Sequence, residues 1–234
     1  MKLTGKVFAV TGGFGNLGVA VGVAATAAGA QVALIGRGAA PNVSKLPATL
    51  SGALLLGNVD VASLEAAQQA LATVAQRFGG LDVLVNAAGA FRWQTLADGD
   101  PDNWDALYSV NLKTAVVASK AALPHLRQRG GGRIINIGAA AAAKGAAGMG
   151  PYTAAKAGVG RLTESLAAEV KDHGINVNAV LPSIIDTPAN RADSPQADFS
   201  RWVTPEALAD VILFLASDAS RAVTGALLPV SGRV

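Results

Sequence analysis

Tyr152 and Lys156 stand four residues apart, near the start of a segment with helical spacing. On a helix, positions i and i+4 lie on one face, so the phenol and the ammonium can point into the same cavity. A free tyrosine has a pKa of about 10, and a cation within a few ångströms favours its ionised form. The spacing therefore predicts a tyrosine with a lowered pKa that exchanges protons near neutral pH. Such spacing also arises by chance on solvated helices. Whether this pair is functional therefore depends on the elements around it.

The composition indicates one closely packed domain. The chain has 234 residues, of which 51% are hydrophobic and 15% charged, so it can bury a full core and is not disordered. The formal net charge is +3, and the basic residues are scattered singly, which argues against a nucleic-acid partner. Cysteine is absent, and His125 and His173 are far apart, so we expect no metal site.

The first six residues lack the apolar region of a signal peptide, and the apolar runs are too short to span a bilayer. We therefore expect a cytoplasmic protein that does not interact with membranes. Its partner would be a small-molecule substrate.

Short apolar runs alternate with longer helical patterns along the chain, which predicts repeated βαβ units. We expect strands at 7–11, 31–35, 53–56, 83–86, 133–137, 176–180 and 226–230, and helices at about 16–28, 62–77, 102–129, 152–172 and 205–216. Pro41 and Pro47 argue against a long helix after the second strand. The predicted fold is a single Rossmann-type α/β domain over residues 1–234, a doubly wound parallel sheet of seven strands. Residues 184–203 lack periodicity and follow the sixth strand, so we expect them to form a substrate loop.

A glycine-rich turn joins the first predicted strand to the first predicted helix. Glycines in it would permit a tight turn and a close approach of the backbone to a pyrophosphate, which the helix N-terminus also attracts. The residues expected to contact this dinucleotide are Gly12, Phe14, Gly15, Asn16, Leu17 and Gly18. Arg37 follows the second strand where an acidic residue would accept a ribose 2′-hydroxyl, so we expect NADP(H) as the preferred cofactor, with NAD(H) as the alternative.

Three further features complete a recognisable set. Asp60 and Val61 follow the third predicted strand, the run Asn86-Ala87-Ala88-Gly89 ends the fourth, and Asn111 lies in the third predicted helix. Together with Tyr152 and Lys156, this set resembles the short-chain dehydrogenase/reductase family over essentially the whole chain.

The resemblance implies roles for these positions. Asp60 and Val61 would meet the adenine, and Asn86, Ala87 and Gly89 would line the cofactor cleft. The segment from Pro182 through Ile185 to Thr187 would hold the nicotinamide; in it, Ser183 replaces the family's glycine. Tyr152 would donate the proton, Lys156 would hold the nicotinamide ribose and lower the pKa of the tyrosine, and Asn111 would anchor a water of the proton relay.

One expected catalytic residue is missing. The family has a serine thirteen residues before the tyrosine, and that position here is Ala139. The serine hydroxyl bonds the substrate carbonyl, and removal of one such donor costs about 3 kcal/mol of transition-state stabilisation. Ala139 would therefore border the substrate, and ordinary ketone reduction should suffer.

The missing serine and the loop also resemble the dihydropteridine reductase branch. That branch implies a quinonoid dihydropterin or similar conjugated imine, which needs less carbonyl polarisation than a ketone does. Arg191, Phe199 and Trp202 could stack on or bond a flat heterocycle, or could simply pack the loop shut. A ketone or 3-oxoacyl reductase is the alternative enzyme, and an inactive nucleotide-binding sensor or subunit is the alternative of another class. By analogy with the family, we expect a homodimer or homotetramer formed through the helices at 102–129 and 152–172.

Overall fold

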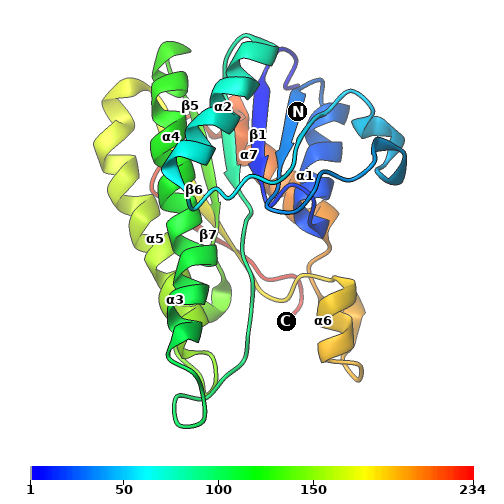
Figure 1. Cartoon of the computed structure of the whole chain (residues 1–234), viewed down its shortest axis with the longest axis vertical. Coiled ribbons are helices and arrows are strands. Elements are labelled where there is room, and N and C mark those ends of the chain that lie inside the picture. Colours follow the sequence, from blue (N-terminus) through cyan, green and yellow to red (C-terminus); the bar gives the residue numbers. More distant parts are fainter. Residues whose placement is uncertain (1) are drawn as a thin grey trace.

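The fold is a parallel sheet covered by helices on both faces, and the computed structural model describes residues 2–234 (Figure 1). Seven strands lie in the order β3-β2-β1-β4-β5-β6-β7, all paired in parallel. They are β1 (Val7–Thr11), β2 (Gln31–Ile35), β3 (Leu54–Leu56), β4 (Val83–Asn86), β5 (Gly132–Ile137), β6 (Ile175–Pro182) and β7 (Leu227–Val230). The order reverses between β1 and β4, which in open α/β sheets is where ligands bind. The predicted fold class is therefore confirmed.

Seven α-helices connect and cover these strands. They are α1 (Asn16–Ala27), α2 (Leu64–Phe78), α3 (Asp102–Tyr108), α4 (Thr114–Gln128), α5 (Gly150–Val170), α6 (Pro188–Asp193) and α7 (Pro205–Ala216). Apolar side chains alternate between the faces of β1: Phe8 and Val10 pack with α1 and α7, whereas Val7 and Ala9 pack with α2, α4 and α5. None of the helices within residues 2–234 combines the length and the apolar composition that a membrane span requires.

The structure agrees with two of the helix predictions and departs from a third. The segment 102–129 is helical up to Gln128 as predicted, with a π-helical turn over Ser109–Lys113 between α3 and α4. After β2, where a long helix is not expected, the chain forms two single 3-10 turns, Val43–Lys45 and Ala48–Leu50. The substrate loop, expected to lack regular structure, contains α6, whose N-terminus is capped by Thr187.

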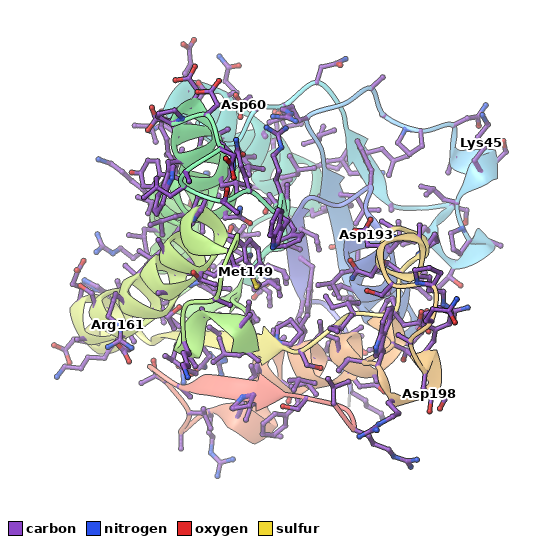
Figure 2. All side chains as sticks on the ribbon, turned by 90° about the horizontal axis from the view of Figure 1, so that it is seen from below. Lys45, Asp60, Met149, Arg161, Asp193 and Asp198 are labelled. Atoms are coloured by element: carbon purple, nitrogen blue, oxygen red, sulfur yellow. The ribbon has the colours of Figure 1, made fainter. Side chains whose placement is uncertain are left out.

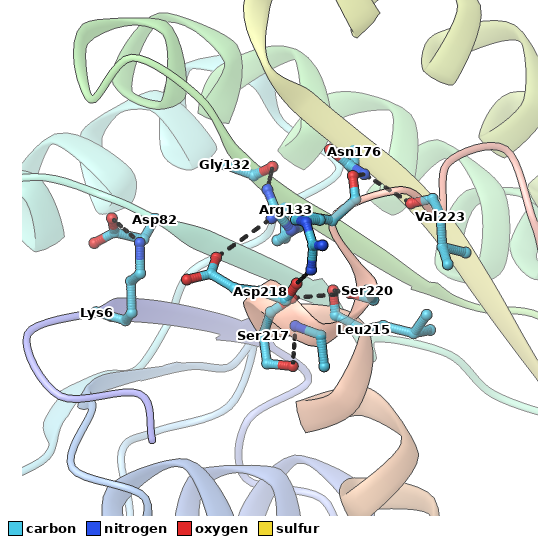
Figure 3. Close-up of polar contacts among 12 residues, drawn as sticks. Lys6, Asp82, Gly132, Arg133, Asn176, Leu215, Ser217, Asp218, Ser220 and Val223 are labelled. Carbon is cyan, nitrogen blue, oxygen red and sulfur yellow. Dashed lines mark hydrogen bonds and ion pairs between the residues drawn. The ribbon is translucent and has the colours of Figure 1, made fainter. Parts of the chain in front are cut away.

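The carboxyl ends of the strands and α6 lie at one end of the molecule, and a set of ion pairs holds the other end. There Asp82 accepts hydrogen bonds from the backbone of Val7 and from Arg129, and pairs with Lys6 (Figure 3). Arg133 reaches Asp218 in the same region. These contacts join the amino ends of β1, β4 and β5, and their role is structural because no residue of the predicted site is among them.

Candidate active site

Tyr152 and Lys156 lie on the first two turns of α5 and line one cavity of about 440 Å³ at the carboxyl edge of the sheet. Pro151 at the start of the helix fixes the first turn, which leaves the two side chains on the same face. Lys156 is 5% exposed, and its ammonium donates a hydrogen bond of 2.7 Å to the carbonyl of Ile137 at the end of β5. The predicted convergence of the phenol and the ammonium on one cavity is thus observed.

The electrostatics of the pair differ from the prediction. Burial raises the pKa of Tyr152, whereas the spacing predicted a lowered value. The reason is that the charge of Lys156 is directed to the Ile137 carbonyl and does not offset the desolvation of the phenol. Burial also lowers the pKa of Lys156 to about 8. In the unliganded chain, Tyr152 is therefore protonated at neutral pH and ready to donate.

Asn111 sits in the π-helical turn and has both of its amide hydrogens in use. They go to the carbonyls of Ala90 (2.9 Å) and Leu107 (3.0 Å), and the side-chain oxygen accepts from the backbone of Ala90 (3.2 Å). Turns of this kind inside α-helices are frequent at functional sites. The side chain ties the helix break to the strand-end loop, so a water in the expected relay would find no free amide donor here.

The side chains of Asn111 and Lys156 leave no room for a side chain at Gly89. A Cβ at this position would lie 2.9 Å from the Asn111 oxygen and 3.3 Å from the Lys156 ammonium. The glycine in the strand-end run is therefore needed to let the lysine and the asparagine approach the β4 end together.

The glycine-rich turn has the form that a dinucleotide needs. Gly12 has a φ of +64°, and a Cβ there would meet the backbone of Ala87 at 2.7 Å, while a Cβ on Gly18 would meet the carbonyl of Gly12 at 2.4 Å. At Gly15, by contrast, the nearest atom would be 3.4 Å away, so protein packing does not demand a glycine there. The bare backbone at Gly15, next to the N-terminus of α1, fits a pyrophosphate that approaches closely.

The predicted cofactor residues fall into three groups. The inner cavity is lined by Leu17, Ala87, Gly89, Tyr152, Lys156, Pro182 and Ile185. An adjoining groove of about 1110 Å³ is lined by Phe14, Gly15, Asn16 and Thr187. Gly12, Gly18, Arg37, Asp60, Val61 and Asn86 line neither.

The side chains of two of these last residues point into the protein interior. The side chain of Asn86 is buried and donates to Ser119 (3.0 Å) and to Asn136 (2.8 Å), which in turn donates to Thr163. Val61 is buried in the core under α2. Because side chains alternate along a strand, the one at the end of β4 points into the helix layer, where Asn86 joins β4 and β5 to α4 and α5.

Arg37 and Asp60 are exposed beyond the ends of β2 and β3. The carboxylate of Asp60 accepts a hydrogen bond from the backbone of Ala62 and so holds the turn before α2. Phe14 lies against Gly36, where a Cβ would come within 2.3 Å of its ring. The ring of Phe14 thus covers one side of the strand end next to Arg37.

Ala139 lies in the cavity wall as predicted, 4% exposed and at the start of a 3-10 turn over Ala140–Ala143. No hydroxyl replaces the missing serine from this turn. Ser183, which stands where the resemblance has a glycine, donates instead to the carbonyl of Ser231 (2.8 Å) near the C-terminus. Its backbone does not occupy the left-handed region, so a serine is tolerated there.

The three residues expected to touch a flat substrate do not line the inner cavity. Arg191 makes a two-pronged ion pair with Asp186 (2.5 and 2.7 Å) and lies 4.8 Å from the ring centre of Phe199. Hydrogen bonds from Arg191 also lower the pKa of Asp186. Phe199 packs on Trp202 (4.9 Å between ring centres), which is 7% exposed. Of the two roles predicted, the geometry matches the packing of the loop.

The cavity is also lined by residues that were not among the predicted site residues. They are Phe91 and Met149, together with Ile184 and Asn190 of the predicted substrate loop. Figure 2 looks onto this end of the molecule and shows Met149 near the centre of the view, with Asp193 to its right. Asp60, Arg161 and Asp198 lie farther out, toward the periphery. The sequence has no motif at Phe91, which stands two residues after Gly89, and its half-exposed position in the cavity is evident from the structure alone.

Comparison with known proteins decides the family. The sequence profile described as short chain dehydrogenase matches residues 6–198. This chain is a short-chain dehydrogenase. As a member of that family it is an NAD(P)-dependent oxidoreductase, and the cavity of Tyr152 and Lys156 is its candidate active site.

Relatives and solved structures match this short-chain dehydrogenase along nearly its whole length. A 3-oxoacyl-(acyl-carrier-protein) reductase of Thermotoga maritima is 34% identical and is aligned over 99% of this chain and 98% of the relative. A 2-(S)-hydroxypropyl-CoM dehydrogenase of Xanthobacter autotrophicus is also 34% identical, over 99% and 97%. The structure of carveol dehydrogenase from Mycobacterium avium in complex with NAD has a TM-score of 0.85 at 28% identity, covering 99% of this chain and 98% of the other. None of these three is named a dihydropteridine reductase, so the branch suggested by the sequence is not shown.

Proposed function

We propose that this short-chain dehydrogenase reduces ketones, including 3-oxoacyl compounds, with Tyr152 as the proton donor. The observation that carries the proposal is the convergence of Tyr152 and Lys156 on one cavity with the strand-end loop and the Pro182–Ile185 segment. Relatives named as 3-oxoacyl reductases support a ketone over a dihydropterin, which reverses the preference drawn from the sequence.

We assign each part of the site a separate role in the reaction. The backbone of the glycine-rich turn at Gly15 would hold the cofactor phosphates, Lys156 the nicotinamide ribose, and the Pro182–Thr187 segment the nicotinamide. A bound nicotinamide would supply the hydride. Tyr152 would donate its proton to the substrate oxygen, and its raised pKa keeps that proton in place until the transfer. Ala139 and Ile184 contribute apolar surface to the wall of the cavity beside Tyr152.

The decisive experiment measures NADPH oxidation with a panel of ketones beside quinonoid dihydropterin. We expect turnover of at least one ketone. Turnover of the dihydropterin alone would contradict the ketone assignment and support the second candidate, which the hydroxyl-free Ala139 favours.

Ala139→Ser should raise kcat for acyclic ketones about tenfold, because the new hydroxyl can donate to the developing oxyanion. The change is small, and the position already borders the cavity. The matched control is Ala141→Ser, which adds the same hydroxyl to another lining residue of the same turn. Equal rates in the parent and Ala139→Ser would show that no carbonyl oxygen binds at this position.

NADP(H) is the proposed cofactor, with NAD(H) as the alternative, because Arg37 is an exposed guanidinium at the end of β2 where a 2′-phosphate would lie. Arg37→Leu should lower kcat/KM for NADPH about tenfold, the equivalent of one charge-assisted hydrogen bond, and leave that for NADH within about twofold. Arg127→Leu removes an exposed cation at the far end of α4 and should change neither. A parent enzyme that prefers NADH would refute the assignment.

We also propose a cytoplasmic homodimer or homotetramer that pairs through α4 and α5. The outward faces of these helices expose Val116, Ala154 and Ala157, which are small enough for two helices to approach closely.

A further inference from the structure

Phe91 is, beside Tyr152, the other aromatic residue among the described residues that line the active-site cavity. The residue is 50% exposed. The two ring centres are 5.0 Å apart, with an angle of 87° between the planes. The rings meet edge to face, and because half of Phe91 stays exposed, part of its surface is open to a ligand.

The loop that carries Phe91 is held in place from the other side of the cavity. The indole of Trp93 donates to the carbonyl of Ala147 (3.1 Å), and the backbone of Gln94 donates to Gly148 (2.9 Å). Gly148 has a φ of +73°, and a Cβ there would strike the indole at 2.1 Å. Asn111 binds both backbone groups of Ala90, the residue before Phe91. Phe91 is therefore fixed at both ends of its loop, and its exposure is built into the site.

The walls around Phe91 are apolar and nearly free of charge. Among the described residues that line this cavity, only Lys156 and Asp193 carry charge. Lys156 is bonded to the Ile137 carbonyl at the base, and Asp193 is exposed on the loop. The nearest loop cation, Arg191, is paired with Asp186 and lines the adjoining groove. Among the described residues that line the cavity, an anionic substrate would thus meet a carboxylate and no guanidinium.

We infer that Phe91 stacks on the substrate and selects flat, uncharged ring carbonyls over acyclic or anionic ones. This inference rests on the proposed ketone reduction and narrows its substrate class. A planar conjugated ring can lie against the open face of Phe91 with its carbonyl toward the Tyr152 hydroxyl. Ala139 leaves room for the ring. An electron-withdrawing carbonyl next to the ketone, as in isatin, makes the ketone more electrophilic and so reduces the need for the missing hydroxyl donor.

The test compares three probes at saturating NADPH: isatin, which is a flat uncharged ring ketone; ethyl acetoacetate, which is acyclic and uncharged; and acetoacetate, which is anionic. We expect kcat/KM to fall in that order. Phe91→Leu should lower kcat/KM for isatin about 3- to 10-fold, mainly through KM, and change that for ethyl acetoacetate by less than about twofold. Phe91→Tyr keeps the ring and should retain isatin turnover. Phe214→Leu removes an exposed phenylalanine of α7 and serves as the control.

Several results would overturn the inference. If Phe91→Leu lowered kcat/KM equally for isatin and ethyl acetoacetate, Phe91 would act only by supporting Tyr152. The pH profile of kcat/KM would then shift as well. Unchanged isatin kinetics, or a preference for acetoacetate, would also refute it.

If the parent reduces none of the three probes, the proposed function fails and the inference is judged by binding alone. Isatin is then titrated calorimetrically into the enzyme saturated with NADP⁺. Binding that Phe91→Leu weakens about 3- to 10-fold supports the stacking role, and binding that is absent or unaffected refutes it.

Discussion

Tyr152→Phe should reduce kcat for ketone reduction by a factor on the order of 10² to 10⁴, the range for loss of a positioned proton donor. The phenol is the one hydroxyl of a tyrosine in the cavity, and the neighbouring Ala139 offers no substitute. Burial keeps the phenol protonated by raising its pKa, so the parent should hold the reactive form throughout neutral pH. Steady-state kinetics with NADPH and a ketone that the parent reduces provide the measurement.

The fold and the cofactor site should survive this substitution. Phenylalanine retains the ring that meets Phe91, so packing at the start of α5 is preserved. We expect the dissociation constant for NADPH, measured by fluorescence titration, to stay within about threefold of the parent value. Tyr108→Phe is a matched control, because Tyr108 is the chain's other tyrosine and is exposed on α3. Undiminished turnover in Tyr152→Phe would remove the tyrosine from the mechanism.

The sequence patterns predicted the central strands well because these strands are buried on both faces. The runs at 7–11, 31–35 and 83–86 match β1, β2 and β4 residue for residue. Short apolar runs bounded by turn residues are the mark of parallel strands between two helix layers, and nothing in these segments conflicts with it. The dinucleotide turn was predictable from local features, namely the positive φ of Gly12 and the close approach of Gly18 to the Gly12 carbonyl.

The π-helical turn between α3 and α4 could not be predicted in the same way. A π-helical turn keeps the helical periodicity on both sides, and its cause is tertiary: the Asn111 side chain bonds the backbone of Ala90, 21 residues earlier. The buried role of Asn86 was also hidden. An asparagine at a strand end has the same pattern whether it faces a ligand or a neighbouring helix, and only the three-dimensional neighbours Ser119 and Asn136 decide.

The substrate loop shows a third limit. Three of its residues have side chains that could bind a flat ring, but these side chains contact one another and Asp186 instead. Arg191 pairs with Asp186 and lies over Phe199, which packs on Trp202. Phe91, which stands in a loop without a motif, has no such partners beyond the perpendicular ring of Tyr152. An ion pair or a stacked pair removes a residue from the site, and pairing of this kind depends on contacts that residue types alone do not specify.

Lys156→Met should lower kcat/KM for reduction on the order of 10²-fold and remove the alkaline limb of the parent's pH profile. The ammonium is the positive charge beside the phenol and is expected to hold the cofactor ribose, and methionine supplies neither the charge nor the donors. Because burial lowers the pKa of Lys156 to about 8, the parent loses the charged form above that pH. The profile of kcat/KM against pH should therefore be flat below about pH 7 and fall tenfold per unit well above pH 8. Tyr152, whose pKa is raised, stays protonated across the same interval, so the limb belongs to the lysine.

The titration of Lys156 should also make the free energy of unfolding depend on pH, and the direction of that change can be predicted. Unfolded, the lysine has a pKa of about 10.4; folded, it releases its proton near pH 8. Between these values the unfolded state binds more protons, so the free energy of unfolding rises with pH in that window. Urea denaturation at pH 7.5, 8.5 and 9.5 should reveal this rise in the parent and in Lys120→Met, which removes an exposed lysine of α4, and a smaller slope in Lys156→Met. A slope that is the same in all three proteins would place the titrating group elsewhere, and the pH profile of catalysis would then need another origin.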